Sequence, residues 1–191
     1  MLQFLNVLAE SFDHDPARLD KLIAETALGN ESAFEELYRS IKASVYGYSL
    51  SVLKRPHDAE DVTHDCFVRI YANAGSYVSH GKPLAWILTI AKRLCFDRLS
   101  EQKNLTSLDD CENDFSDLSL LSNDELTAVR SLISLLSDDE RSIIMLHAVS
   151  GFRHREIAEF LSLPLSTVLS KYHRAIKKLK TAYIQDERNA K

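Results

Sequence analysis

The sequence predicts an all-α protein, with two small helical domains joined by an acidic linker. Apolar residues recur in steps of three and four along most of the chain, as they do on the buried face of a helix. Only 5 Gly and 4 Pro occur in 191 residues, too few for the frequent turns of sandwiches and barrels. With 45% hydrophobic and 27% charged residues, the composition is globular, and the length allows one large or two small domains.

Three long helices are expected in the first half of the chain. The first begins after Asn30, a residue suited to cap a helix N-terminus, and ends near Arg55-Pro56. The second runs from about Asp58 to Ala74, and a loop over residues 75–83 follows because this stretch holds two glycines and a proline. The third runs from Leu84 to about Leu99. The buried face of the first helix is expected to carry Phe34, Leu37, Tyr38, Ile41, Val45, Tyr48 and Val52, and that of the second Ala59, Val62, Cys66 and Ile70.

The middle of the chain reads as a linker. Residues 100–122 lose the helical period and are rich in Asp, Glu, Ser and Asn. We therefore expect a first domain over residues 24–99 and a second over 123–185, with residues 1–23 as an unassigned N-terminal extension.

The second domain is expected to end in a helix-turn-helix. Helical periodicity resumes at residues 126–136, and Ser137 with Glu140 has the Ser-x-x-Glu spacing of a capping box for a helix that stops before Gly151. A short helix over Arg155–Leu161, a turn at residues 162–164 and a final helix to about Tyr183 follow. This order of short helix, tight turn and longer helix is typical of DNA-binding proteins.

The final helix carries an apolar stripe and a cationic stripe. At 100° per residue, Val168, Tyr172, Ala175 and Leu179 share one side and are expected to pack. A neighbouring stripe is expected to meet DNA. Residues early in the helix lie nearest the base edges, and the later cations Arg174, Lys177 and Lys178 are expected to hold the phosphate backbone. The candidate DNA-binding residues are Ser166, Thr167, Ser170, Lys171, Arg174 and Lys178.

Charge is distributed unevenly along the chain, whose formal net charge is −5. Residues 1–65 carry −6 and residues 100–122 carry −5, whereas residues 66–99 carry +4 and residues 123–191 carry +2. Two cationic segments thus flank an acidic one, and the overall acidity does not exclude a nucleic-acid partner.

Cellular location and cysteine chemistry follow from what the sequence lacks. No apolar run approaches the roughly 20 residues of a membrane span, and the N-terminus lacks the basic region of a secretory signal. We expect a cytoplasmic protein without direct membrane insertion. Its 3 cysteines are widely spaced with no CxxC, so small hydrophobic residues are favoured over a disulfide, redox or zinc site.

Four stretches together resemble a known family. They are Asn30–Tyr38, Asp58–Tyr71, Ala85–Arg93 with Asp97, and Leu163–Lys171. In this order, with an acidic linker between the third and fourth, the chain resembles the extracytoplasmic-function (ECF) group of sigma-70 family RNA polymerase sigma factors. The resemblance implies a bacterial factor that binds core RNA polymerase, recognises the −35 and −10 promoter elements and aids promoter melting.

The resemblance also implies a role for each stretch. The last helix is expected to read the −35 element, and the second helix to dock on the polymerase clamp through Asp58, Asp61, Asp65 and Phe67. The loop and the third helix are expected to take the −10 element. An extruded base can stack on an aromatic ring and bond to polar groups. Trp86 is expected to be a buried anchor of the three-helix domain, with DNA contact as the alternative. The −10 candidates are Tyr77, Ser79, His80, Lys82, Thr89, Lys92 and Arg93.

The family implies partners but no covalent chemistry. Core RNA polymerase and promoter DNA are the expected partners, and an anti-sigma factor is a further one. No catalytic, cofactor-binding or metal-binding residues are expected. Two alternatives stay open: a di-iron enzyme using Asp61-x-x-His64, which lacks a second pair of this kind, and a dimeric operator-binding regulator.

Overall fold

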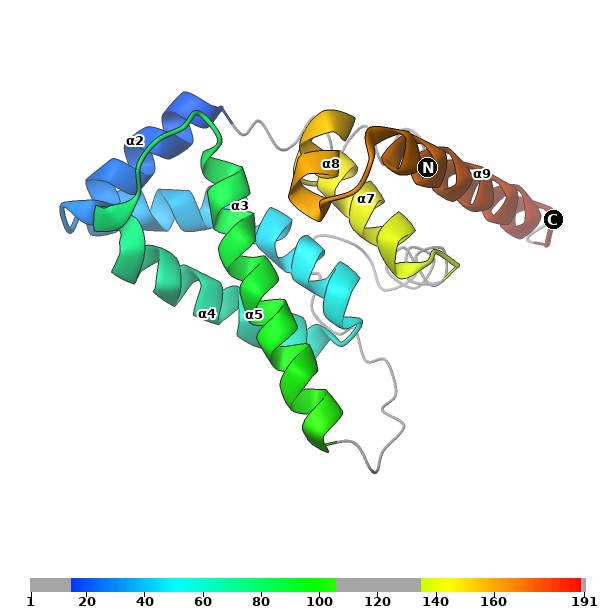
Figure 1. Ribbon diagram of the computed structural model, residues 1–191, viewed down its shortest axis with the longest axis horizontal. Helices are drawn as coiled ribbons and strands as arrows, with labels where there is room; N and C mark the ends of the chain where they lie inside the picture. The colour runs from blue at the N-terminus through cyan, green and yellow to red at the C-terminus, as the bar shows by residue number, and fades with distance from the viewer. Residues whose placement is uncertain (1–14, 106–134, 190–191) are drawn as a thin grey trace. The chain divides into compact units, whose positions relative to one another are not determined.

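The computed structural model describes residues 15–105 and 135–189, which form helices joined by short loops and no strand. They belong to two compact units, each considered by itself. The N-terminal unit contains α2 to α5 and the C-terminal unit contains α7 to α9 (Figure 1). No helix of the described part is long and apolar enough to cross a membrane.

The N-terminal unit opens with a helix that the sequence reasoning missed, α2 (Pro16–Ala27). The Asp15 side chain accepts a hydrogen bond from the Ala17 amide at 3.1 Å, and Pro16 occupies the first turn, where its missing N–H costs nothing. Leu19, Leu22 and Ile23 are buried because α2 packs against α3. The boundary expected at residue 24 therefore cuts through a helix of the first unit.

The next two helices match their predicted positions closely. Helix α3 (Glu31–Leu53) begins after Asn30, whose side chain accepts from the Ala33 amide at 3.2 Å, and ends at Lys54 in the left-handed conformation. Helix α4 (Pro56–Asn73) continues into the short 3-10 turn η1 (Ala74–Ser76). Most residues predicted on the inner faces of these two helices are buried, which confirms those faces. They are Leu37, Ile41, Val45, Tyr48, Ala59, Val62, Cys66 and Ile70.

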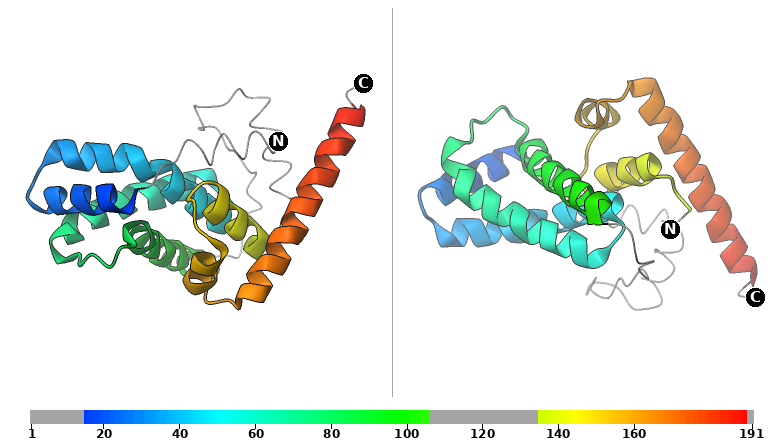
Figure 2. Two further views of the ribbon diagram at one scale, coloured as in Figure 1. Left: turned by 90° about the horizontal axis from the view of Figure 1, so that it is seen from above. Right: turned by 60° about the horizontal axis from the view of Figure 1, so that its bottom comes forward.

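The last helix of this unit, α5 (Pro83–Leu105), is longer than predicted. It continues past the expected end at Leu99 because its last turns are tied to α4: Arg98 and Gln102 both bond to Asp58. The linker expected from residue 100 therefore starts no earlier than residue 106. Figure 2 shows α2 to α5 bundled together, with the loop before α5 at one end.

The C-terminal unit contains the predicted helix-turn-helix. Helix α7 (Asp138–Ala148) starts with the expected capping box, in which Glu140 accepts from the Ser137 amide at 3.0 Å. Helix α8 (His154–Leu161) ends at Ser162, whose φ of 56° reverses the chain into α9 (Leu165–Asn189). The periodic segment expected over residues 126–134 and the linker over 106–122 lie outside the described residues.

Candidate nucleic-acid interface

The apolar stripe of α9 packs as predicted. Val168, Ala175 and Leu179 are buried, the last two in one cluster with Leu136 and Ile144. The half-buried Tyr172 completes the stripe against this cluster. This packing fixes which side of α9 stays open, because a helix that buries one stripe must expose the opposite one.

The open face of α9 is rotated slightly from the predicted cationic stripe. Ser166, Ser170 and Arg174 are exposed as expected, whereas Thr167 is half-buried. His173 and Lys177 are also exposed, and their spacing from Ser166 and Ser170 places all four on one helix face. Lys177 was expected to contact the phosphate backbone, whereas His173 was missed. No acidic residue occurs in this stretch of the sequence.

Two of the predicted DNA-binding cations are paired with acids at the start of α7. The Lys171 ammonium lies 2.7 Å from Asp139, and that of Lys178 lies 2.7 Å from Glu140. In the first pair the lysine is the more buried partner, with the Lys171 side chain 22% exposed. In the second pair the acid is the more buried partner, with the Glu140 side chain 4% exposed. The expectation that both lysines face DNA did not foresee these partners, because the acids lie more than 30 residues earlier in the sequence.

The loop before α5 is fastened to α2 by one carboxylate. The Tyr77 hydroxyl donates to Oδ1 of Asp20 at 2.6 Å, and the Ser79 hydroxyl donates to Oδ2 at 2.6 Å. The Tyr77 ring also lies 4.6 Å from that of Trp86, which is half-buried rather than fully buried. The hydroxyl groups of Tyr77 and Ser79, two of the predicted −10 candidates, thus bond within the protein.

The remaining −10 candidates lie at the surface of the loop and along α5. His80, Lys82, Thr89 and Arg93 are exposed. Lys92 is half-buried, and this burial lowers the pKa of its ammonium. The exposed ring of Phe96 lies one turn beyond Arg93 and was not anticipated.

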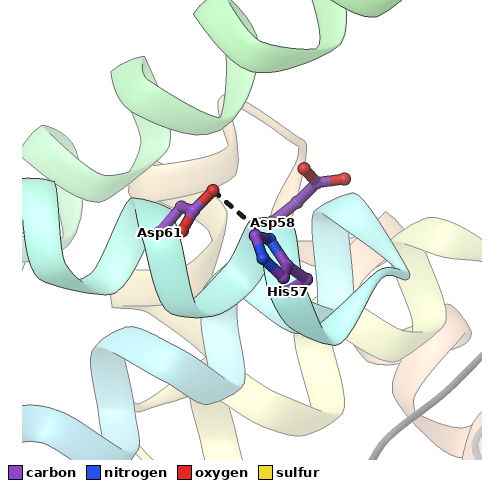
Figure 3. A group of neighbouring side chains, drawn as sticks. All are labelled: His57, Asp58 and Asp61. Atoms are coloured by element: carbon purple, nitrogen blue, oxygen red, sulfur yellow. Dashed lines mark ion pairs between the residues drawn. The ribbon is translucent and has the colours of Figure 1, made fainter.

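The acidic start of α4 is an ion-pair cluster. Arg98 bonds to both Asp58, at 3.2 Å, and Asp61, and Gln102 donates to the second oxygen of Asp58 at 2.8 Å. Figure 3 shows these two aspartates beside His57, whose Nδ1 lies 3.4 Å from an Asp61 oxygen.

This cluster bears on the metal-site alternative. Within the described residues, His57, Asp58 and Asp61 bring their potential ligand atoms within 4.8 Å of one another. The guanidinium of Arg98 pairs with both carboxylates, and its single positive charge offsets one of their two negative charges. His64, the histidine of the di-iron alternative, is outside this group.

The polymerase-contact candidates separate into buried and exposed residues. Phe67 is 4% exposed, with its ring 4.5 Å from that of Tyr38, so it belongs to the core, contrary to expectation. Asp65 is exposed. The same helix exposes Val68 and Tyr71, which were not among the predicted contacts.

Comparison with known proteins decides the family. Residues 37–104 match Sigma-70 region 2, and residues 126–179 match Sigma-70, region 4. An ECF RNA polymerase sigma factor SigK of Mycobacterium sp. (strain KMS) is 31% identical over 172 residues, covering 85% of this chain and 89% of the relative. The chain belongs to the ECF RNA polymerase sigma factors. A second SigK, from Mycolicibacterium vanbaalenii, is 32% identical over 174 residues, covering 86% of this sigma factor and 88% of the relative.

Solved structures share the fold. CnrH in complex with the cytosolic domain of CnrY matches with a TM-score of 0.60 at 24% identity, over 88% of this chain and 99% of CnrH. RpoE of Bartonella quintana, in complex with the anti-sigma factor NepR, matches with a TM-score of 0.65 at 19% identity, over 78% of this chain and 96% of RpoE. Sigma factors are transcription initiation factors that bind core RNA polymerase and direct it to promoters, and this is the function of the chain.

Proposed function

We propose that this sigma factor reads the −35 element with the open face of α9. The observation that carries the proposal is the set of exposed polar and cationic side chains on a helix-turn-helix, with no acid among them. Ser166 and Ser170 lie early in the helix, where base edges are nearest, and Arg174 and Lys177 lie where phosphates pass. Thr167 lies at the edge of this face.

Lys171 and Lys178 act at the border of the same surface. Each ammonium is held by an α7 carboxylate, and a phosphate must compete with that carboxylate. Lys171, whose partner Asp139 is itself half exposed, can exchange partners at little cost. Lys178 stays with the buried Glu140 and serves mainly the fold.

The −10 element is assigned to the loop and the exposed side of α5. His80 and Lys82 are placed to contact an unpaired base of the non-template strand, which Tyr77 and Ser79 support from behind. Thr89 and Arg93, together with Lys92, lie along α5 where the neighbouring duplex runs.

Core polymerase is assigned to the exposed face of α4. Asp61 and Asp65 supply acidic groups for a basic surface, and exposed Val68 and Tyr71 supply apolar contact area. Both Asp58 and Asp61 pair with Arg98, but the Asp58 side chain is only 15% exposed against 44% for Asp61, so Asp58 contributes through Arg98 and not by direct contact. Phe67 supports the helix from the core.

The domain organisation, location and control complete the proposal. The two units act as separate promoter-reading modules joined by an acidic linker. An anti-sigma factor is the proposed regulator, since sigma factors of the same fold were solved bound to CnrY and to NepR. The chain works in the cytoplasm and performs no covalent chemistry itself.

Transcription reconstituted with core RNA polymerase tests the −35 assignment. The double variant Arg174→Ala/Lys177→Ala should transcribe poorly from a cognate promoter, and the salt slope of promoter binding should fall by about 2. Its binding to core polymerase should be unchanged. The matched control, Arg39→Ala/Lys42→Ala, removes two exposed cations from α3 and should transcribe normally. Normal transcription by the first variant would overturn the assignment of α9.

A further inference from the structure

One carboxylate connects a helix outside the matched family region to the loop assigned to base capture. Asp20 lies on α2, before residue 37 where the Sigma-70 region 2 match begins. Its two oxygens accept from Tyr77 and Ser79, 57 and 59 residues later in the chain, both at 2.6 Å. Hydrogen bonds to a charged acceptor are among the stronger polar contacts in proteins.

These two bonds determine which way the loop presents its side chains. Tyr77 has extended backbone angles, and in an extended segment residues two apart point to the same side. Because Tyr77 and Ser79 both point at Asp20, Val78 and His80 are directed away from α2. Accordingly Val78 is 65% exposed and His80 is exposed.

Further contacts brace this arrangement. The Ser79 hydroxyl, while donating to Asp20, accepts from the Gly81 amide at 3.4 Å. Gly81 has a φ of 71°, a conformation that glycine adopts without strain, and it turns the chain into α5. At the other end of the loop, the Tyr77 ring rests on Trp86.

The Tyr77 hydroxyl is a permanent donor in this contact. Burial, together with the bond to the Asp20 carboxylate, raises the pKa of Tyr77 to about 12. The hydroxyl therefore stays protonated and able to donate at the pH at which transcription is assayed.

We propose that Asp20 is a positioning residue for base capture: it holds the loop Tyr77–Lys82 so that the outward side chains, His80 above all, receive an unpaired base of the non-template strand. The proposal rests on the assignment of this loop to the −10 element. Asp20 touches no DNA itself; it fixes the geometry of the residues that do. Pre-organisation of this kind favours binding because the loop need not be ordered when the strand arrives.

The experiment uses the holoenzyme and fluorescent single-stranded probes carrying the non-template −10 sequence of a mapped promoter. Each probe is either intact or abasic at one position. Wild type should bind roughly ten-fold more weakly when the captured base is missing, the scale of one stacked base. Asp20→Ala should reduce that penalty to about two-fold. Removing the negative charge of Asp20 strengthens the binding of both probes alike. The ratio of the affinities for the intact and the abasic probe is therefore insensitive to that change.

Three single variants and one double variant separate positioning from general damage. Arg18→Ala breaks the ion pair of α2 with Glu36, 2.7 Å long, without touching the loop, and should keep the full penalty. Tyr77→Phe removes one of the two bonds to Asp20 and should lower the penalty part of the way. Combined with Asp20→Ala it should add nothing, because Asp20→Ala already removes that bond. Asp20→Asn, which retains an acceptor for Tyr77, should keep much of the wild-type penalty for the abasic probe.

The free sigma factor provides a readout independent of DNA. Trp86 is the only tryptophan and lies against Tyr77, so Asp20→Ala should shift its emission to longer wavelength as the loop departs. Unchanged emission would show that Asp20 does not hold the loop, and shifted emission with an intact base penalty would show that the held geometry is irrelevant to capture. Either result overturns the proposal. A wild-type holoenzyme with no position-dependent penalty overturns the assignment of the loop to base capture, and the role of Asp20 with it.

Discussion

Replacing Glu140 should loosen the C-terminal unit while leaving the N-terminal unit unchanged. The Glu140 side chain is 4% exposed and accepts two hydrogen bonds, from the Ser137 amide at 3.0 Å and from the Lys178 ammonium at 2.7 Å. The first completes the capping box of α7, and the second joins α7 to α9. One side chain thus connects the start of the unit to the recognition helix.

The expected loss can be worked out from these two bonds. Half of a capping box contributes about 1 kcal/mol. A buried charged pair can contribute more, but Lys178 is 46% exposed, so solvent screening reduces the pair to about 1 kcal/mol. Glu140→Ala should therefore cost about 2 kcal/mol. Glu140→Gln keeps an acceptor for Ser137 and should cost about 1 kcal/mol.

The Glu140 carboxyl group is ionised at neutral pH. Burial alone would raise the pKa of Glu140, but the bonds from Lys178 and Ser137 leave it below its ordinary value of 4.5. For a carboxyl group whose pKa is lowered by folding, the stabilisation is complete above the unfolded-state pKa and is lost as pH falls below it. The contribution is therefore fully present at pH 7.

Hydrogen–deuterium exchange resolved by peptide measures this loss in the full chain. Amides of α7 and α9 that exchange through opening of the unit should exchange about 30-fold faster in Glu140→Ala and about five-fold faster in Glu140→Gln. Peptides from α3 to α5 should be unaffected, and Lys180→Ala, which removes an exposed cation of α9, should match wild type. Equal exchange in all variants, or acceleration in α3 to α5, would refute the reasoning.

Three further predictions follow from named contacts. Asp139→Asn releases Lys171 from its 2.7 Å partner and should tighten holoenzyme binding to −35 DNA by roughly two- to five-fold; weaker binding in a titration would contradict it. Burial raises the pKa of Cys66 to about 12 and that of Cys95 to about 11, so mass mapping should find both unalkylated at pH 8 in the native protein and fully alkylated in urea. Burial and neighbouring histidine rings lower the pKa of His154, so its ring should titrate below 6.5 by NMR; its contribution to stability is complete above that pH and is lost as pH falls.

Local signals predicted most helices correctly. Caps and apolar spacing depend on residues a few positions apart, and they located the start of α3 at Asn30 and of α7 at Ser137. The same kind of signal was present for α2, where Asp15-Pro16 precedes buried Leu19 and Leu22, but it was not used.

Contacts between distant parts of the chain account for the remaining differences. The extension of α5 depends on bonds from Arg98 and Gln102 to Asp58, about 40 residues earlier. Nothing in the local sequence around Ser100 indicates that partner. The polar, acidic segment after Leu99 was therefore predicted to be linker, whereas tertiary hydrogen bonds continue the helix to Leu105.

The candidate site shows the same division. Which residues of α9 are polar could be read directly, but which cations remain available depended on acids of α7. Likewise Tyr77 and Ser79 were recognised as residues of the −10 loop, whereas their orientation toward Asp20 required the packing of α2. Sequence pattern identified the surfaces, and tertiary contacts determined which atoms face outward.

The most direct test of the sigma-factor assignment is transcription from genomic DNA with core RNA polymerase, with and without this chain, followed by mapping of the start sites. New starts should appear only with the chain, each preceded by a shared −35 and −10 pair at constant spacing. Without core polymerase the chain should show no specific duplex binding, because its two small DNA-reading surfaces act together only when the polymerase holds them. A dimeric chain that binds one duplex site tightly by itself and adds no start sites would contradict the account.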